Sequence, residues 1–306
     1  MSDLLSIITP VYNRSCLMKR LYYSLQAQSN NDFNWIIVDD GSTDNIDDVV
    51  ESFCKQARFQ IKYIKQKNQG KCAALNKAIE ICDEQLFMVV DSDDYLVTDA
   101  IEQIHKYWKK VQLKKDLVGI AAYKILSDRK ISGKPFKNGL VKSTLNALNY
   151  HYNRHGELAL IYKTSIVKKY PHHIHTQENF LSEEIQYNSL DQEGYLYLMG
   201  KPLIIMEYQN NGLTKNYFKN WITNPVGTIE LLKSKYSTVI GLSVADIIKK
   251  RIKTIIQFNA CILNSQAINI NDSPNKFLSY ILLLPSKLYT AKLKIGNNNN
   301  EFYSKY

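Results

Sequence analysis

Short apolar runs alternate with stretches of helical periodicity along the first 125 residues. The apolar runs, most of them rich in β-branched residues, cover residues 4–8, 33–38, 61–64 and 86–90. Leucines recur after the first run at Leu17, Leu21 and Leu25, which is the spacing of one helical face. Further helical patterns follow the second and third runs, the latter over residues 71–81. Strands that alternate with helices of about 10–15 residues predict βαβ units and a buried, mostly parallel sheet.

The pattern is less regular after residue 125. Residues 127–150 include Gly133, Pro135 and Gly139 and predict loop and irregular strand. The elements that we predict beyond them are helices over 161–169 and 183–190, short strands over 195–199 and 203–208, and a mainly helical region after 214. The sequence therefore predicts an α/β protein, a mostly parallel sheet flanked by helices, with a helical C-terminal extension.

The C-terminal third is both basic and amphipathic. Residues 214–306 hold 13 Lys+Arg against 4 Asp+Glu, a net of +9 within a total of +10. One helical face collects the apolar residues Val244, Ile248, Ile252, Ile255 and Phe258, while lysines cluster elsewhere on that helix. Together with the run 280–284, this region has the character of a segment that rests on an anionic membrane surface. Three alternatives stay open: packing on the rest of the chain, pairing of two copies into a homo-oligomer, and lysines scattered by a general bias of the sequence.

Composition removes several classes of protein. The chain has 306 residues, 45% of them hydrophobic and 22% charged, which excludes a disordered or fibrous protein. The first glycine is Gly41, so no glycine-rich phosphate loop follows the first strand, which disfavours dinucleotide binding and nucleotidyl transfer. The five cysteines form no CxxC pair and favour a reduced protein. With no apolar run of about 18 residues and no basic N-terminal segment, we expect a cytoplasmic protein, peripheral at the inner face of the plasma membrane if the basic third binds lipid.

Polar, acid-rich segments follow the first, second and fourth predicted strands. They are Pro10–Asn13, Asp39–Ser42 and Asp91–Asp94. Ligands of open α/β sheets bind beyond the carboxyl ends of the strands, so these segments predict a site on one rim. An aromatic residue beside carboxylates suits a nucleobase, and the spacing of Asp91 and Asp93 suits Mn²⁺ or Mg²⁺ carrying phosphate oxygens. Taken singly, each segment is also explained as a turn or a helix cap.

These segments, in this order, resemble the inverting family 2 glycosyltransferases of the GT-A fold. Four stretches match: Ser6–Asn13, Val38–Asp44, Asn68–Asn76 and Val90–Leu96, the last with the DxD motif. A weaker match continues to residue 214. The resemblance implies a catalytic domain over 1–214, with a nucleotide-sugar half at about 1–125 and an acceptor half at about 126–214. It leaves 215–306 as a basic helical region.

The resemblance also implies roles for single residues. The nucleotide-sugar-binding residues would be Pro10, Tyr12, Asn13, Asp40, Asn68, Gly70, Lys71, Asn76, Asp91 and Ser92, and the metal ligands Asp93 and Asp91. Tyr12 would pack on the donor base, uracil by preference, where stacking is worth about 1–3 kcal/mol. Asp40 would accept a hydrogen bond from the ring N–H. The cation, Mn²⁺ or Mg²⁺, would neutralise the departing diphosphate.

The general base is the least determined of these roles. The family places it in a Glu-Asp pair that opens a helix, whereas this chain has Glu183-Glu184. Glu184 takes the position of the aspartate, and its side chain is one methylene longer. Glu183 therefore stays an alternative base, and repulsion between the two acids would raise one pKa.

The resemblance implies an enzyme that moves a sugar from a nucleotide-diphosphate donor, by preference a UDP-sugar, to a hydroxyl of a glycan or lipid-linked acceptor in cell-surface polysaccharide synthesis. The alternative is a catalytically inactive nucleotide-sugar-binding module or partner subunit. A nucleic-acid partner is disfavoured, because it would explain the basic third but not the acidic rim. The sugar, the acceptor and the linkage do not follow from the sequence.

Overall fold

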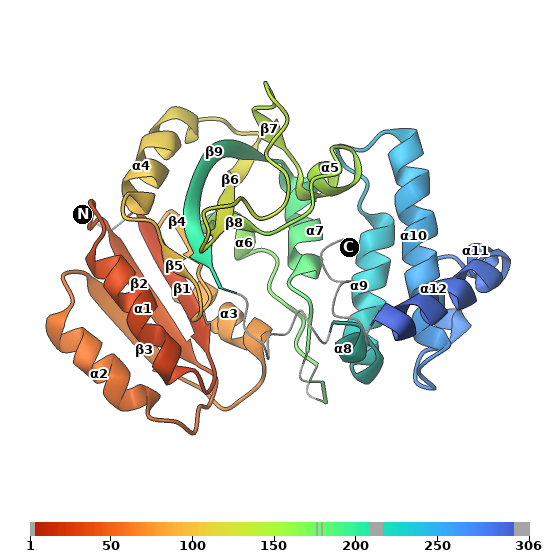
Figure 1. Cartoon of the computed structure of the whole chain (residues 1–306), viewed down its shortest axis with the longest axis horizontal. Coiled ribbons are helices and arrows are strands. Elements are labelled where there is room, and N and C mark those ends of the chain that lie inside the picture. Colours follow the sequence, from red (N-terminus) through yellow and green to blue (C-terminus); the bar gives the residue numbers. More distant parts are fainter. Residues whose placement is uncertain (1–3, 176, 179, 208–216, 297–306) are drawn as a thin grey trace. The chain divides into compact units, whose positions relative to one another are not determined.

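The computed structural model describes residues 4–175, 177–178, 180–207 and 217–296 (Figure 1). By packing, the chain divides into two compact units. The first comprises the described parts of Met1–Ser143, Gly156–His172 and Glu193–Gln209, and the second those of Thr144–His155, His173–Gln192 and Asn210–Tyr306. The domain boundary predicted at 214 lies outside the described residues. Two earlier segments, 144–155 and 173–192, pack with the C-terminal helices.

The first unit is built on a mixed sheet. Its strands are β1 (Leu5–Val11), β2 (Phe33–Asp39), β3 (Gln60–Lys65), β4 (Leu86–Val89), β5 (Tyr95–Leu96), β6 (Leu117–Leu126), β7 (Lys142–Ser143), β8 (Leu158–Lys163) and β9 (Tyr195–Met206). They follow the order β3-β2-β1-β4-β8-β6-β9-β5, and β7 pairs with β9. The part made of β3, β2, β1 and β4 is parallel, while β8 joins β4 and β6 in antiparallel fashion. The parallel strands are those predicted from the apolar runs.

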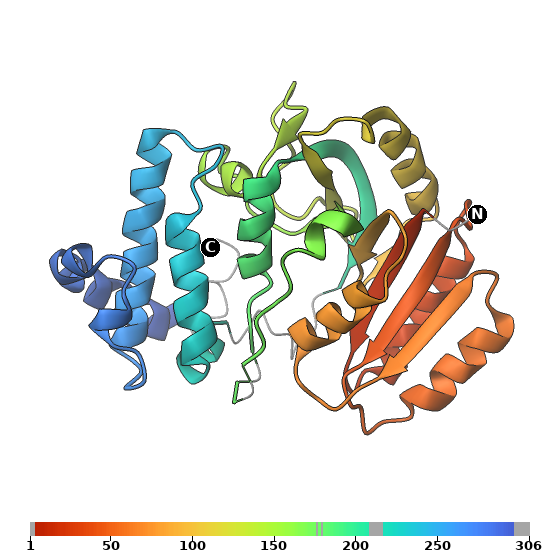
Figure 2. The same cartoon turned by 180° about the vertical axis from the view of Figure 1, so that it is seen from behind.

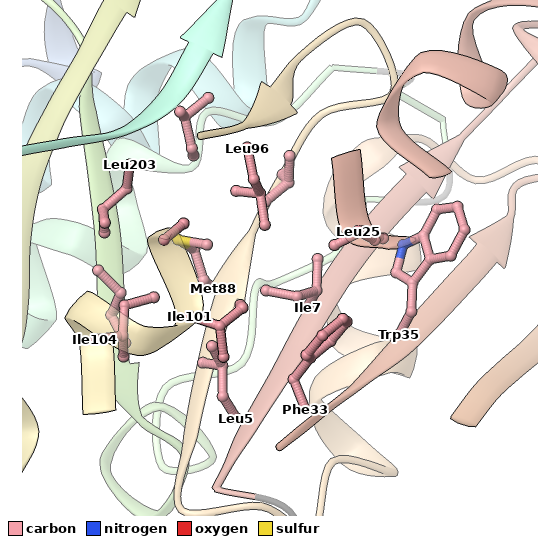
Figure 3. Close-up of a cluster of buried hydrophobic side chains, with 14 of the residues drawn as sticks. Leu5, Ile7, Leu25, Phe33, Trp35, Met88, Leu96, Ile101, Ile104 and Leu203 are labelled. Carbon is pink, nitrogen blue, oxygen red and sulfur yellow. The ribbon is translucent and has the colours of Figure 1, made fainter. Parts of the chain in front are cut away.

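Helices cover both faces of this sheet, which appear in turn in Figures 1 and 2. The helices of the unit are α1 (Ser15–Gln26), α2 (Ile46–Gln56), α3 (Lys71–Glu80), α4 (Ala100–Val111) and the single turn α6 (Thr164–Val167). The apolar faces of α1, α2 and α4 share one cluster with alternate residues of β1 and β2, such as Ile7 and Trp35 (Figure 3). Helix α3 packs on the same strands, but its buried residues lie outside that cluster. The predicted α/β class is thus confirmed.

The second unit is helical. Its helices are α5 (Leu145–Tyr150), α7 (Glu184–Glu193), α8 (Tyr217–Thr223), α9 (Pro225–Ser237), α10 (Val244–Ile262), α11 (Lys276–Ile281) and α12 (Leu283–Gly296), with a 3-10 turn at Ile270–Asp272. A small core joins α8, α9 and α10 through Trp221, Leu232 and Phe258. Among the described residues, no helix has the length and hydropathy needed to span a bilayer.

The predicted elements over 161–169 and 195–208 are correct only in part. Residues 161–163 of the expected helix belong to strand β8, and the helix is the single turn Thr164–Val167. Strand β8 pairs with β4 and β6, so sheet pairing decides the conformation of those residues. The two short strands expected at 195–199 and 203–208 are the single strand β9, because a shift in register against β6 accommodates Gly200 and Lys201.

The predicted apolar face of α10 is only half buried. Ile255 and Phe258 are fully buried, but Val244 is 74% exposed and Ile248 54%. Lys250, expected on the solvent side, is 1% exposed. Its ammonium donates to the side-chain oxygen of Asn146 and, at 2.6 Å, to the carbonyl of Thr238. Helix α10 therefore buries a hydrogen-bonded lysine where the pattern predicted a charged surface.

Candidate active site

The parallel strands bring three of the predicted segments to one rim of the first unit. Val11 at the end of β1 is in register with Asp39 at the end of β2, and β1 also pairs with β4. The residues that follow these strands therefore leave the sheet at the same edge. The site predicted from the strand ends is assembled from the segments 10–13, 39–44 and 90–94.

Asn13 joins the first two of these segments. Its φ of 50° is in the left-handed region, which asparagine tolerates better than most residues. Its side-chain oxygen accepts a hydrogen bond from the Thr43 N–H at 2.7 Å, and its own N–H donates to the Ser42 hydroxyl at 2.9 Å. Asn13 thus holds two loops together. Tyr12, the residue before it, is 47% exposed.

Asp40 organises the loop that leads into α3. Its carboxylate is 4% exposed and accepts hydrogen bonds from the Gln66 side chain at 2.8 Å, the Gln69 N–H at 2.9 Å and the Gly70 N–H at 2.8 Å. A carboxylate has about four acceptor positions, so these bonds leave room for one more donor. The predicted role of Asp40 as acceptor from a base is compatible with this arrangement, and Asp40 has a loop-forming role as well.

The loop approaches the end of β2 so closely that position 41 must be a glycine. Its φ is +79°, and a Cβ atom there would lie 2.8 Å from the backbone nitrogen of Asn68. Both conditions exclude a side chain. The order Asp40-Gly41 thus lets the end of β2 pack directly against residues 66–70, which include the predicted ligand residues Asn68 and Gly70.

Basic side chains neutralise the DxD turn. The Lys71 ammonium lies 2.8 Å from Asp91, and the Arg14 guanidinium lies 3.1 Å from Asp93. Arg20 donates to the Asp93 carbonyl at 2.6 Å. The prediction paired Asp91 and Asp93 as metal ligands and placed Lys71 among the donor-binding residues; the structure brings all three to this turn.

The surroundings of Asp91 keep its carboxylate ionised. Burial raises its pKa, but the charges of Lys71, Lys124 and Arg14 outweigh this effect and lower the pKa to about 2. Asp91 and Asp93 therefore offer hard oxygen donors, of the type that fits Mg²⁺ or Mn²⁺. In the described part of the chain, no group of three or more His, Cys, Asp or Glu side chains is gathered around a metal position.

Asp94, the last acid of the DxD turn, forms a buried ion pair with Lys124. Its carboxylate is 2.8 Å from the Lys124 ammonium, and the two side chains are only 7% and 9% exposed. Burial raises the pKa of Asp94 to about 6, although Lys124 opposes this. Burial lowers the pKa of Lys124, but Asp94 and Asp91 raise it above its usual range. This pair fixes the end of the DxD turn to β6.

Several residues of the site were not predicted. Arg14, Arg20 and Lys124 each contact the DxD turn, and Arg20 also pairs with Glu207 and lies 4.7 Å from the ring centre of Tyr95. Arg14 directly follows the first matched stretch, and this position is the one sequence signal that could have identified it. Arg20 and Lys124 lie far from the DxD motif in sequence, and only the fold brings them to it.

Three other residues predicted to bind the nucleotide-sugar lie within the packed structure of the first unit. Asn76 exchanges two 2.8 Å hydrogen bonds with the backbone of His172. Pro10 lies within β1 beside Val38. Ser92 is 2% exposed inside the DxD turn. Their predicted contacts with a donor stay predictions.

The predicted bases lie at the start of α7 in the second unit. Glu184 forms an ion pair with Lys235 of α9 at 3.2 Å, and its side chain is 35% exposed. Glu183 accepts a hydrogen bond from the Tyr187 hydroxyl at 3.0 Å. Glu184 thus contacts a basic side chain, and Glu183 contacts the first turns of α7.

Asp191 anchors the other end of α7. It is 2% exposed and accepts from the backbone N–H groups of Leu145 and Asn146 at 2.9 Å and 2.8 Å. Burial raises the pKa of Asp191, and the two N–H donors oppose this. Since Asn146 also contacts Lys250, one buried network connects α5, α7 and α10.

Comparison with known proteins agrees with the sequence motifs. A family model described as Glycosyl transferase family 2 matches residues 6–170. A glycosyltransferase, GlyG, of Streptococcus pneumoniae is 32% identical over 107 residues, which are 35% of this chain and 35% of that protein. An uncharacterised glycosyltransferase of Rickettsia conorii is 38% identical over 98 residues, 32% of this chain and 16% of its own length. The chain thus aligns with about a third or less of these curated relatives.

Solved structures share the fold over most of the chain. Staphylococcus aureus TarS 1-349 in complex with UDP-GlcNAc has a TM-score of 0.61 at 14% identity, covering 95% of this chain and 92% of that one. The mannosyltransferase PcManGT from Pyrobaculum calidifontis, in complex with GDP-Man and Mn²⁺, has a TM-score of 0.53 at 13% identity, covering 97% and 88%. At these identities the likeness concerns the fold.

Proposed function

The chain belongs to glycosyltransferase family 2, and from this premise we propose that it transfers a sugar from a UDP-sugar to a hydroxyl of a glycan or lipid-linked acceptor, with inversion at the anomeric carbon, in cell-surface polysaccharide synthesis. The observation that carries the proposal is the shared rim, where Tyr12, Asp40 and the DxD turn follow neighbouring parallel strands. A structural neighbour that holds UDP-GlcNAc supports a UDP donor.

The base of the donor stacks on Tyr12 and donates its ring N–H to Asp40. Tyr12 is exposed enough to present its ring. The carboxylate of Asp40 is held by two backbone N–H groups, so its position is set before the donor arrives. Preorganised acceptors of this kind discriminate against a base that lacks the matching N–H.

Asp93 and Asp91 would hold a divalent cation, Mn²⁺ or Mg²⁺. A bound cation supplies charge neutralisation to the departing diphosphate. Around this position, Lys71 and Arg14 already supply two positive charges, and they add to the positive potential that stabilises a leaving anion. The neighbour that contains GDP-Man and Mn²⁺ supports metal use in this fold.

Glu184 accepts the proton from the attacking hydroxyl, with Glu183 as the alternative base. General bases contribute about 10²- to 10⁴-fold to the rate.

The test is release of the nucleotide from a panel of UDP-, GDP- and dTDP-sugars, with Mn²⁺ or with a chelator, in the absence of acceptor. We expect UDP-sugars to be hydrolysed slowly with Mn²⁺, and Asp93→Asn to abolish the reaction. A preference for GDP- or dTDP-sugars would contradict the role given to Asp40, and activity that survives both chelation and Asp93→Asn would contradict the metal site.

The alternative is a module that binds the nucleotide-sugar without turnover. The observation that favours it is the pairing of both DxD carboxylates with basic side chains, Lys71 and Arg14, which can bind a diphosphate without a cation. Calorimetric titration with UDP separates the two functions: binding of UDP without any nucleotide release from the panel would establish the module.

A further inference from the structure

Helices α11 and α12 present large apolar side chains to solvent. Those more than half exposed are Phe277 (73%), Tyr280 (61%), Ile281 (57%), Leu284 (70%) and Leu288 (64%). Relative to Phe277 they lie at positions +3, +4, +7 and +11, and α12 begins two residues after α11 ends. This spacing places them on one side of consecutive helical turns. We refer to these five residues as the outer face.

The fully buried residues of the same helices are small and polar. Ser279 and Ser286 are fully buried and Thr290 is 7% exposed. The Asn259 side chain of α10 donates to the Ser279 carbonyl at 2.8 Å, and the Ser286 and Thr290 hydroxyls donate to backbone carbonyls four residues earlier. A helix that packs on a core normally buries its large apolar residues. Here the large apolar residues are either half-buried, as Leu278, Leu282, Leu283 and Tyr289 are, or mostly exposed on the outer face.

The segment that carries the outer face is basic. Residues 273–296 include four lysines, Lys276, Lys287, Lys292 and Lys294, and no aspartate or glutamate. Lys276 and Lys287 flank the outer face and are exposed. Exposed apolar side chains beside lysines are the two features of a helix that lies in the surface of an anionic bilayer.

We propose that the outer face of α11 and α12 binds an anionic membrane surface, with the apolar side chains in the interfacial layer and the lysines against lipid phosphates. A second copy of the chain is the less favoured occupant. In a symmetric dimer the same patch meets itself, which would bring lysines against lysines with no acid in the segment to pair with them. The proposal is independent of the reaction given above, because it uses none of the residues of the candidate active site.

The experiment is co-sedimentation of the full chain with vesicles of phosphatidylcholine alone or mixed equally with phosphatidylglycerol, at low and high salt. We expect binding to the mixed vesicles that weakens with salt, and weak binding to phosphatidylcholine. Phe277→Ser with Leu284→Ser should lower the affinity by roughly tenfold for each side chain lost. The matched control is Leu113→Ser, which removes a leucine that is 90% exposed in the first unit and should leave binding unchanged.

Two further measurements keep the test decisive. Lys276→Glu with Lys287→Glu should abolish the preference for phosphatidylglycerol, and far-UV circular dichroism checks that each variant is folded. The proposal is overturned if the folded Phe277→Ser, Leu284→Ser variant binds vesicles as the parent does, or if the parent binds none. It is also overturned if the parent sediments as a dimer that this variant converts to a monomer, since the outer face would then be the contact between two copies.

Discussion

Replacement of Lys124 by methionine tests whether the buried ion pair holds the DxD turn. The variant leaves the Asp94 carboxylate buried without its ammonium partner, 2.8 Å away in the parent. Removing one member of a buried pair costs about 3–5 kcal/mol. Protonation of Asp94 limits this cost. Because Asp94 already has a pKa of about 6 in the parent, neutralising the carboxyl at pH 7 costs about 1.4 kcal/mol relative to the parent, which is about one pH unit.

The same reasoning fixes the pH dependence. In the variant the folded pKa of Asp94 rises further. In the parent, Asp94 has a pKa of about 6 and is itself mostly protonated at pH 5, so the pH-dependent penalty is present above about pH 6 and disappears as the pH falls through that value. We therefore expect the loss of stability to be greater at pH 7 than at pH 5 by about 1.4 kcal/mol.

The assay is urea unfolding followed by tryptophan fluorescence in a Trp221→Phe background, so that Trp35 and Trp108 report on the first unit. Lys142→Met is the matched control, because it breaks a Lys–Asp pair whose side chains are 49% and 46% exposed, and it should cost less than about 1 kcal/mol. Adding Asp94→Asn to Lys124→Met should restore most of the stability. Equal losses at pH 5 and pH 7, or a control as damaging as Lys124→Met, would refute the reasoning.

Three other outcomes follow from the structure. Gly41→Ala should destabilise the first unit by about 1–3 kcal/mol and raise the donor KM in the nucleotide-release assay, because the new Cβ displaces residues 66–70; an unchanged KM would contradict this. Glu184→Gln should lower kcat for transfer to acceptor by about 10²- to 10⁴-fold while Glu183→Gln has a small effect, and the reverse result would make Glu183 the base. Burial lowers the pKa of Lys250 to about 8, so the second unit should gain stability as the pH rises from about 8 towards the unfolded pKa near 10.5; hydrogen exchange should show that gain in the parent and not in Lys250→Met.

The predictable part of the fold is the part with local patterns. The apolar runs of β1, β2 and β4 and the leucines of α1 specify their elements without help from distant residues, and the structure has them within a few positions. The helix predicted over 161–169 begins too early because the conformation of residues 161–163, in β8, is decided by pairing with β4 and β6, which leaves no periodic signal. The burial of Lys250 depends on Asn146 and Thr238, more than ten residues away.

Sequence motifs predicted the acids of the candidate site but did not distinguish their surroundings. Asp40 and Asp94 are equally buried, yet one is held by backbone N–H groups and the other by an ammonium. Amide donors leave a carboxylate able to accept a further bond, whereas a buried ion pair commits its carboxylate to the scaffold. Within the DxD turn, Asp91 and Asp93 are the more accessible acids, with side chains 33% and 15% exposed. Each contacts a basic side chain to which an anionic ligand can bind. The division between the acid that fixes the turn and the acids that we propose to bind the ligand therefore depends on their partners, and the fold brings those partners to the rim.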